Sequence, residues 1–192
     1  SKMVWVPNGV NSTRFAPNPE QRELTRQELG IPDDAPVIGF VGRFHPVKDI
    51  ATFFRAAARL QKLRPDARFV MVGGTEAELY PETRTAFEQL PHREAVHFVP
   101  FGSATERYYP AFDVFCLCSK SEAFPNVVLE AMATGLPCVT TDAGDCKTML
   151  HDLGTVVPVN DDQGLADGWN AMLSLSNHQR AALALSSRGR AI

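Results

Sequence analysis

The sequence lacks any long hydrophobic run, because no stretch of about 18 consecutive apolar residues occurs in its 192 residues. It also lacks a strong excess of one charge: 19 Lys and Arg stand against 22 Asp and Glu, which leaves a net charge of -3. Its first residues lack the basic, apolar and small-residue order of a signal peptide. We therefore expect a soluble, cytoplasmic chain with no transmembrane segment and no nucleic-acid partner.

Cysteine is scarce, and its spacing does not match a zinc site. The four cysteines stand at positions 116, 118, 138 and 146 and form no paired C-x-x-C knuckles. We expect them to pack in the core and predict no metal site. The phosphate-binding signatures G-x-x-x-x-G-K-[ST] and G-x-G-x-x-G are missing as well. Their absence argues against a P-loop nucleoside triphosphatase and against a nicotinamide-dependent dehydrogenase.

Short apolar segments alternate with segments of helical periodicity. The apolar segments, rich in β-branched and aromatic residues, cover 37–43, 67–74, 96–101, 113–119 and 137–143, with a weaker one at 155–159. Several are apolar at nearly every position, which is typical of strands covered on both faces of a parallel sheet. Helical spacing occurs at 49–63, 77–91 and 126–135. This order predicts an α/β fold, a Rossmann-like doubly wound parallel sheet.

The two ends of the chain differ from its middle. Residues 1–20 are rich in Pro, Asn and Ser, and we interpret them as a linker or leading segment outside the core. Residues 21–192 are then one domain. The C-terminal sequence HQRAALALSSRGRAI is helical in pattern but has no capping glycine or turn, so we expect it to be cut short.

The stretch EAFPNVVLE, from Glu122 to Glu130, places a helix start directly after a predicted strand. Proline suits the first turn of a helix, so we predict a helix over 125–134. The free amides of Asn126 and Val127 would then lie at the carboxyl edge of the sheet, at the positive end of the helix dipole. That combination suits a phosphate group.

The two glutamates of this stretch are placed for different tasks. Glu130 lies more than one turn inside the helix, where its carboxylate could accept from a ribose diol set back from the phosphates. Glu122 lies on the loop before the helix and could face the group beyond a diphosphate. The alternative is that both are ordinary solvated carboxylates.

A second cluster lies in GFVGRFHPVKD, where Arg43 follows the first predicted strand and Lys48 opens the next helix. Both cations fall at the same carboxyl edge and could neutralise a diphosphate, including the charge that develops as it leaves. As an alternative, they are ordinary surface charges. His45 lies in the same loop, although a lone loop histidine is more often solvated.

Two further strand ends belong to this edge. Gly74, which closes FVMVGG, would let a ligand approach the backbone, or it serves a plain strand-end turn. Phe101, followed by Gly102 and Ser103, ends the next strand and could hold a nucleobase through its backbone groups.

Together these residues resemble the C-terminal half of a family 4 (group 1) retaining glycosyltransferase with the GT-B fold. The signature of that family is Glu, seven residues, Glu, present as Glu122 to Glu130. The resemblance continues, in the order of the family, through VPNGVNSTRF, VGRFHPVKD, FVMVGG, VHFVPFG and EAMATGLPCVTTDAG. It covers nearly the whole chain.

The resemblance implies that this domain binds the nucleotide-sugar donor. Arg43 and Lys48 would bind the diphosphate, Glu130 the ribose and Glu122 the donor sugar. The backbone of Phe124, Pro125, Asn126 and Val127 would contact sugar and phosphate. The family needs no metal or cofactor and transfers a hexose from a UDP-, GDP- or ADP-sugar with retention at the anomeric carbon. The leaving diphosphate assists proton removal from the acceptor, so Glu122 is not assigned as a nucleophile.

Departures from the family pattern are informative. Ala123 replaces the usual glycine, and TDAGDCKTML places Lys147 and Thr148 where other members carry a Pro-Glu pair. This variant form resembles transferases of bacterial surface polysaccharides. The N-terminal half that would bind a glycan or lipid-linked acceptor is not in this sequence. We therefore expect a donor-binding domain that does not transfer sugar alone, from an enzyme that is cytoplasmic or peripheral at the inner membrane.

Functions outside sugar transfer also fit parts of the pattern. A non-catalytic nucleotide- or nucleotide-sugar-binding regulatory module would share the fold, but Arg43, Lys48, Glu122 and Glu130 are all retained. Within the enzyme class, a nucleotide-sugar epimerase and a relative of glycogen synthase are further candidates.

Overall fold

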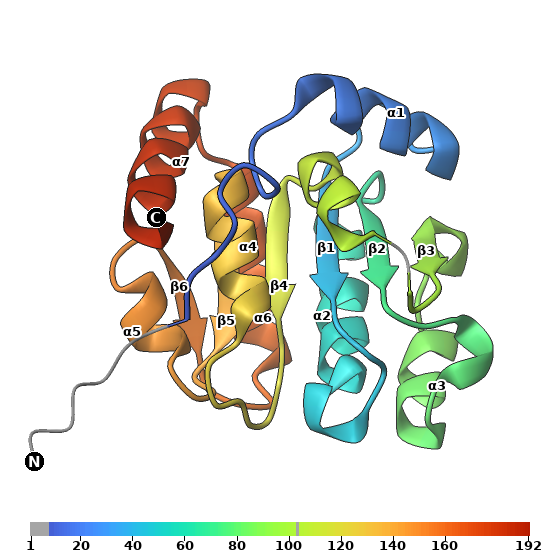
Figure 1. Cartoon of the computed structure of the whole chain (residues 1–192). Helices are drawn as coiled ribbons and strands as arrows, with labels where there is room; N and C mark the ends of the chain where they lie inside the picture. Colours follow the sequence, from blue (N-terminus) through green and yellow to red (C-terminus); the bar gives the residue numbers. More distant parts are fainter. Residues whose placement is uncertain (1–7, 103) are drawn as a thin grey trace, which may run out of the picture.

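A six-stranded parallel sheet forms the centre of the molecule (Figure 1), in a computed structural model that describes residues 8–102 and 104–192. The strand order is β3-β2-β1-β4-β5-β6. The strands are β1 (Val37–Val41), β2 (Arg68–Val72), β3 (Val96–Val99), β4 (Val114–Leu117), β5 (Cys138–Thr141) and β6 (Gly154–Val157). Each overlaps a segment predicted from sequence, so the doubly wound α/β class is confirmed.

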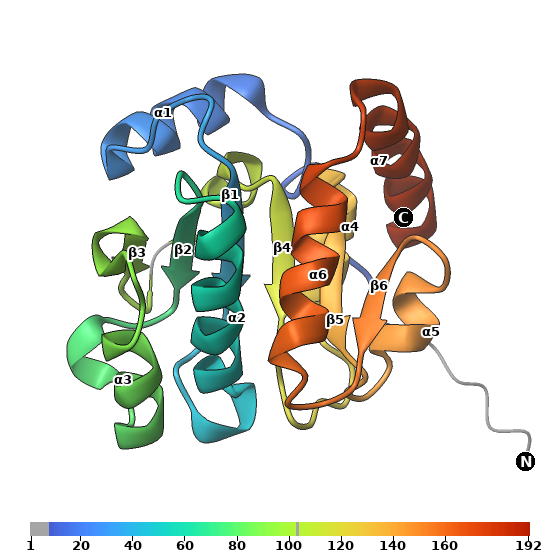
Figure 2. The same cartoon turned by 180° about the vertical axis from the view of Figure 1, so that it is seen from behind.

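Helices cover both faces of the sheet, as the apolar strands require. Figure 2 shows one face covered by α2 (Ile50–Leu63), α3 (Pro81–Glu88) and α6 (Asp162–Leu173). The other face carries α4 (Asn126–Thr134), α5 (Cys146–Leu150) and α7 (Asn177–Ala191) (Figure 1). Short 3-10 helices connect the elements: η1 (Pro46–Lys48), η2 (Glu76–Glu78), η3 (Arg93–Ala95), η4 (Thr105–Arg107) and η5 (Tyr109–Ala111). Among the described residues, no helix has the length and apolarity needed to cross a membrane.

Each face has its own hydrophobic core. On the face of α2 and α6, the ring of Phe53 lies 5.0 Å from that of Trp169, centroid to centroid, and both side chains are fully buried. On the opposite face, Tyr109 and Phe115 pack 5.8 Å apart beneath α4. The four cysteines are buried and free, as expected. Burial raises the pKa of the Cys146 thiol to about 11.

The leading segment contributes to the core. Phe15 is buried and makes an edge-to-face contact with Tyr109, at 5.6 Å between ring centroids. A helix, α1 (Pro19–Leu29), begins before residue 20 and is capped by Asn18, whose side chain accepts from the amide of Gln21. The expectation that residues up to 20 lie outside the core is wrong for Phe15, because one aromatic side chain can fill a gap without any periodic pattern in the sequence. Residues 1–7 of that predicted linker lie outside the described residues.

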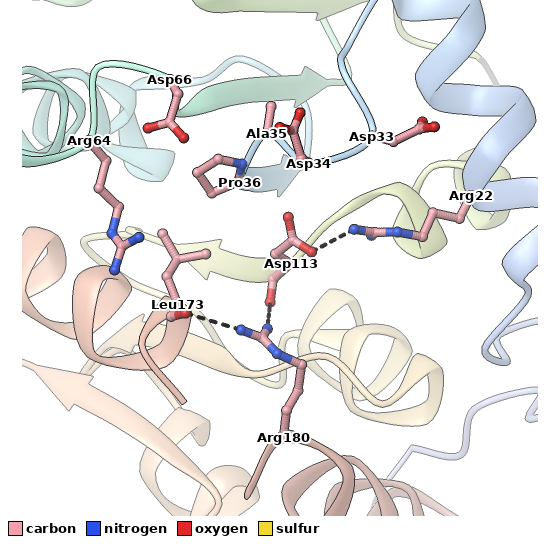
Figure 3. Close-up of a pocket in the computed structure, with 10 residues that line it drawn as sticks. All are labelled: Arg22, Asp33, Asp34, Ala35, Pro36, Arg64, Asp66, Asp113, Leu173 and Arg180. Carbon is pink, nitrogen blue, oxygen red and sulfur yellow. Dashed lines mark hydrogen bonds and ion pairs between the residues drawn. The ribbon is translucent and has the colours of Figure 1, made fainter. Parts of the chain in front are cut away.

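An ionic network closes the amino edge of the sheet. Asp113 accepts hydrogen bonds from Arg22 at 2.7 Å, from Arg26 at 2.8 Å and from the amide of Val37 at 2.8 Å. The side chain of Arg26 is 1% exposed, and desolvation lowers its pKa. Figure 3 shows the neighbouring pocket, where Arg180 reaches the backbone carbonyl of Asp113 from α7. The network therefore ties α1 and α7 to the start of the two central strands.

The two central strands define the place where the winding direction reverses. β1 pairs with β4 through Ile38 and Val114, and the chain runs outward from this pair in opposite directions. The carboxyl ends of all strands lie along one edge, at the bottom of Figure 1, opposite α1. In open α/β sheets, ligands bind in the crevice outside this edge.

Candidate functional site

Side chains from two distant segments meet at the carboxyl edge, where β1 and β4 end side by side. A pocket there is lined by the end of β1 and the segment after it, through residues 41–45, Val47 and Lys48, and by Val127 from α4. The sequence-predicted cations and the predicted helix start therefore face the same space.

Lys48 and Glu122 contact each other directly across this site. Lys48 Nζ lies 2.6 Å from Glu122 Oε1, and the Ser119 hydroxyl donates to the same oxygen at 2.5 Å. The Ser119 backbone is fixed in turn, because its carbonyl accepts from the Thr141 hydroxyl at 2.6 Å. Both donors use Oε1, so within the described part of the chain Glu122 Oε2 has no hydrogen-bond partner and is available to a ligand hydroxyl.

Arg43 provides a second cation. Its side chain is exposed at the pocket and makes no ion pair with any described residue. A guanidinium in this position offers a planar fork to an anion, whereas the Lys48 ammonium offers a point charge. His45, by contrast, caps η1: its Nδ1 accepts from the amide of Val47 at 3.3 Å.

The start of α4 adds amide donors to the site. The helix begins at Asn126, with Pro125 as its N-cap, one residue later than predicted. The amides of Asn126 and Val127 have no backbone acceptor among the described residues, which leaves both free at the positive end of the helix dipole. The Asn8 side chain donates to Asn126 Oδ1 at 3.0 Å, so the leading segment runs past this helix start. Phe124 packs against the core on the same side.

Glu130 lies three residues after Val127 and therefore on the same side of α4. The hydroxyl of Tyr109, a fully buried residue, donates to Glu130 Oε2 at 2.6 Å. Burial raises the pKa of the Glu130 carboxyl, and the tyrosine hydrogen bond opposes that rise. Burial and the Glu130 charge also hold the pKa of Tyr109 well above its usual value, so Tyr109 is the proton donor of the pair.

A smaller and mostly apolar pocket lies beside the first. Gly42, Arg43, Gly73 and Phe101 are among the residues that line it, and Phe101 is 70% exposed. Gly74 is not part of this lining. A Cβ at Gly74 would lie 2.5 Å from Cδ2 of Phe44, so the glycine is needed there for packing of the Phe44 ring.

The nearby Gly73 has a different requirement. Its φ is 120°, and a Cβ there would lie 2.3 Å from the carbonyl oxygen of Gly42, so the backbones after β1 and β2 approach closely. Ser103, which the sequence placed beside Phe101, lies outside the described residues.

The loop after β5 supports the segment that carries Glu122. Gly144 has a φ of 58°, and a Cβ there would lie 2.5 Å from the carbonyl oxygens of Glu122 and Ala123. The amide of Asp145 donates to the Ala123 carbonyl at 3.2 Å. Lys147 and Thr148, which mark the variant form of this loop, are exposed on α5.

The sequence did not single out Ser119, Tyr109 or Gly144. Ser119 sits only three residues before Glu122 and directly after a strand, a position that favours a site role. Tyr109 had no comparable signal, because its partner follows 21 residues later on another element. Across the described residues, no three His, Cys, Asp or Glu side chains gather closely enough to hold a metal ion.

Comparison with known proteins identifies the family. Residues 21–189 match the family described as glycosyl transferases group 1. The chain belongs to the group 1 glycosyl transferases. Their GT-B fold explains the observed sheet order: HepE from Anabaena, solved with UDP-glucose, superimposes on 96% of this chain with a TM-score of 0.84 at 24% identity. The match covers 51% of the HepE chain.

Two curated relatives have sequences close enough to align over most of the chain. The D-inositol 3-phosphate glycosyltransferase of Kineococcus radiotolerans is 33% identical over 174 residues, which is 86% of this chain and 40% of that protein. The UDP-Gal:alpha-D-GlcNAc-diphosphoundecaprenol alpha-1,3-galactosyltransferase of Escherichia coli is 30% identical over 165 residues, which is 83% of this chain and 42% of that protein. The group 1 chain described here thus spans less than half of the length of each relative.

Proposed function

We propose that this chain is the donor-binding domain of a family 4, retaining hexosyltransferase that needs no metal or other cofactor. The observation that carries the proposal is one pocket lined by Arg43, Lys48 and Val127 at the start of α4, with Glu122 in direct contact with Lys48. Two cations and two amide donors match the charge of a nucleoside diphosphate. The similarity to HepE, whose structure contains UDP-glucose, supports a nucleotide sugar as the ligand.

The proposal gives each group a task. The amides of Asn126 and Val127 and the cations Arg43 and Lys48 bind the diphosphate and stabilise the charge that it gains as the sugar leaves. Glu130, one helical turn beyond Val127, accepts from the ribose hydroxyls. The smaller apolar pocket beside Phe101 is placed for the nucleobase of a UDP-, GDP- or ADP-sugar.

Glu122 positions the transferred sugar. Its Oε1 is held by Lys48 and Ser119, so Oε2 accepts from a hydroxyl of the hexose. The diphosphate that departs takes the acceptor proton on the same face of the sugar, which accounts for retention without a carboxylate nucleophile. The acceptor, a growing glycan or a lipid-linked sugar, binds an N-terminal domain beyond this sequence, and this donor domain alone is inactive.

The biological setting that we propose is the synthesis of bacterial surface polysaccharide. The Escherichia coli relative is named for a diphosphoundecaprenol-linked acceptor, which supports a lipid-linked acceptor here. Such an acceptor places the complete enzyme in the cytoplasm or at the cytoplasmic face of the inner membrane.

Calorimetry on this chain tests the proposal. We expect one of UDP, GDP and ADP to bind, with the same affinity in EDTA as in magnesium or manganese, because two fixed cations replace the metal. Glu130→Ala should weaken the nucleoside diphosphate and its hexose conjugate alike, whereas Glu122→Ala should weaken only the conjugate. Glu88→Ala, an exposed glutamate at the end of α3, is the matched control.

Two results would contradict the assignment. One is a loss of affinity in EDTA that added magnesium restores, and the other is unchanged binding in both glutamate variants. The alternative, a non-catalytic nucleotide-binding module, predicts the same nucleotide affinity but no turnover when the complete protein is supplied with donor and acceptor.

A further inference from the structure

The side chain of Tyr109 is placed to act on Glu130 rather than only to fill the core. Its ring is fixed on several sides, by Phe15 at 5.6 Å, Phe112 at 5.9 Å and Phe115 at 5.8 Å between centroids. Its hydroxyl lies 2.6 Å from Glu130 Oε2, whereas the other acceptor within reach, the carbonyl of Val127, lies at 3.4 Å. The short hydrogen bond therefore goes to the carboxylate.

The hydrogen bond leaves Glu130 asymmetric. Oε2 is held by the buried hydroxyl, while Oε1 has no hydrogen-bond partner among the described residues. A glutamate side chain has three rotatable bonds, and fixing one oxygen before a ligand arrives removes part of the entropy cost of binding. The other oxygen remains to accept from a ligand.

We propose that Tyr109 is a positioning residue that holds Glu130 by one oxygen, so that the other accepts from the vicinal hydroxyls of a ribonucleotide. This inference depends on the proposed function, which assigns Glu130 to the ribose. Tyr109 itself is buried and does not contact the nucleotide. Its effect on binding reaches the ligand entirely through Glu130.

The charge state of Glu130 is part of the same arrangement. The titratable groups that face it are Tyr109 on η5, Glu106 on η4 and Arg14 in the leading segment. Burial and Glu106 raise the pKa of Glu130, and the Tyr109 hydroxyl and Arg14 lower it. Removing the hydroxyl therefore raises the pKa further, and a larger fraction of Glu130 is protonated at mildly acidic pH. A protonated carboxyl is a poorer acceptor for a diol.

The test compares ribonucleotides with dideoxyribonucleotides. The ligands are whichever of UDP, GDP and ADP binds this chain most tightly and its 2',3'-dideoxy form, titrated by calorimetry between pH 5 and 8. The variants are Tyr109→Phe, which keeps the ring, and Glu130→Gln. The control is Tyr108→Phe, since Tyr108 is an adjacent tyrosine that is also buried. Thermal unfolding verifies that each protein is folded.

We expect Tyr109→Phe to weaken the ribonucleotide about tenfold, as for the loss of one hydrogen bond to a charged group. The affinity of the dideoxynucleotide for Tyr109→Phe should be almost the same as its affinity for the wild type. The pH at which ribonucleotide affinity falls should also move upward in Tyr109→Phe, and Tyr108→Phe should behave like the wild type. A purely structural role would weaken both ligands equally and would leave the pH profile in place.

The outcomes separate this inference from the proposed function. If Glu130→Gln weakens the ribonucleotide but Tyr109→Phe does not, or weakens both ligands equally, the role of Tyr109 is overturned and the ribose assignment stands. If Glu130→Gln changes nothing, or if no nucleotide binds, both fail. Should Tyr109→Phe not fold, 4-fluorophenylalanine at position 109 fills the space of the hydroxyl without a donor, and the same comparison applies.

Discussion

Lys48 and Glu122 are 74 residues apart in sequence, yet Lys48 Nζ lies 2.6 Å from Glu122 Oε1. In the proposed function, the ammonium serves both this carboxylate and the diphosphate. Because a diphosphate would then compete with Glu122 for Lys48, we expect the two residues to affect nucleotide affinity in opposite directions.

Removing either partner tests this competition. Lys48→Met should weaken the nucleoside diphosphate at least about tenfold, because a charge-assisted contact is lost. Glu122→Gln should leave it unchanged or tighten it up to about threefold, because a nearby negative charge is removed. Lys62→Met, on the exposed side of α2, is the control. Parallel losses in Lys48→Met and Glu122→Gln would mean that the ion pair holds the pocket together and does not compete with the ligand.

Gly144 should be intolerant of a side chain. Alanine there would be strained at a φ of 58° and would bring its Cβ within 2.5 Å of two carbonyl oxygens of the Glu122 loop. We expect a loss of about 1 to 3 kcal/mol in the free energy of unfolding, together with weaker binding of the hexose conjugate. Urea unfolding and calorimetry measure the two effects.

The comparison for Gly144 is Gly189 on α7, where an added Cβ meets nothing within 4 Å. Gly189→Ala should raise the free energy of unfolding by about 0.5 to 1 kcal/mol through helix propensity. If Gly144→Ala had the same free energy of unfolding as the wild type, the contact between the loop after β5 and the Glu122 loop would not be rigid.

Asp113 should be the most costly charge to remove. Asparagine there would leave the buried guanidinium of Arg26 without its ionic partner, which costs about 3 to 5 kcal/mol in comparable buried pairs. Asp66→Asn, which changes an exposed carboxylate lining the same pocket (Figure 3), should change the free energy of unfolding by less than about 0.5 kcal/mol. Chemical denaturation of both variants decides this. Similar free energies of unfolding for Asp113→Asn and Asp66→Asn would show that the backbone carbonyls around Arg26 stabilise its guanidinium without Asp113.

His97 should make the fold sensitive to mild acid. Desolvation and the nearby Arg68 charge lower its pKa in the folded state, and its Nε2 has no hydrogen-bond partner among the described residues. Below a pH of about 6.5 the unfolded chain binds a proton that the folded chain does not, so stability falls as pH falls, until the folded pKa is reached.

The variant His97→Gln removes this titration. Its free energy of unfolding relative to wild type should therefore improve steadily from pH 7 to pH 5 in urea unfolding experiments. His178→Gln, at an exposed position on α7, is the control for the His-to-Gln substitution itself. If the difference in free energy of unfolding between His97→Gln and wild type did not change with pH, the pH dependence of stability would come from other residues.

The four inner strands were predictable because each is buried along most of its length and therefore apolar, whereas the edge strands β3 and β6 are mostly half-buried. β1 and β4 are buried at every position, and both were located to within two residues. α1 and α6 were not predicted, since α1 is dominated by polar residues and α6 carries glycines within its apolar pattern. Tertiary packing stabilises these helices despite their weak local signals.

At the site, the sequence predicted which segments meet but not how their side chains pair. The carboxyl-edge rule located Arg43, Lys48 and the start of α4. The contacts to Ser119 and Tyr109 depend on side-chain directions that no spacing in the sequence encodes. For Gly74 the sequence left ligand approach and a strand-end turn both open, and only the position of Phe44 shows the packing role of this glycine.

The pairing of β1 with β4 also determines when the pocket can exist during folding. Ile38 pairs with Val114, and the pocket is lined by residues of the segment 41–48 on one side of this join and by Val127 on the other. Such long-range contacts pay a loop-closure entropy that local helices do not, so they are slow to form. Under the proposed function, a nucleotide would lack its complete site on a chain in which the two halves of the sheet are still apart. Its binding energy should therefore appear as slower unfolding, while the rate of refolding stays the same.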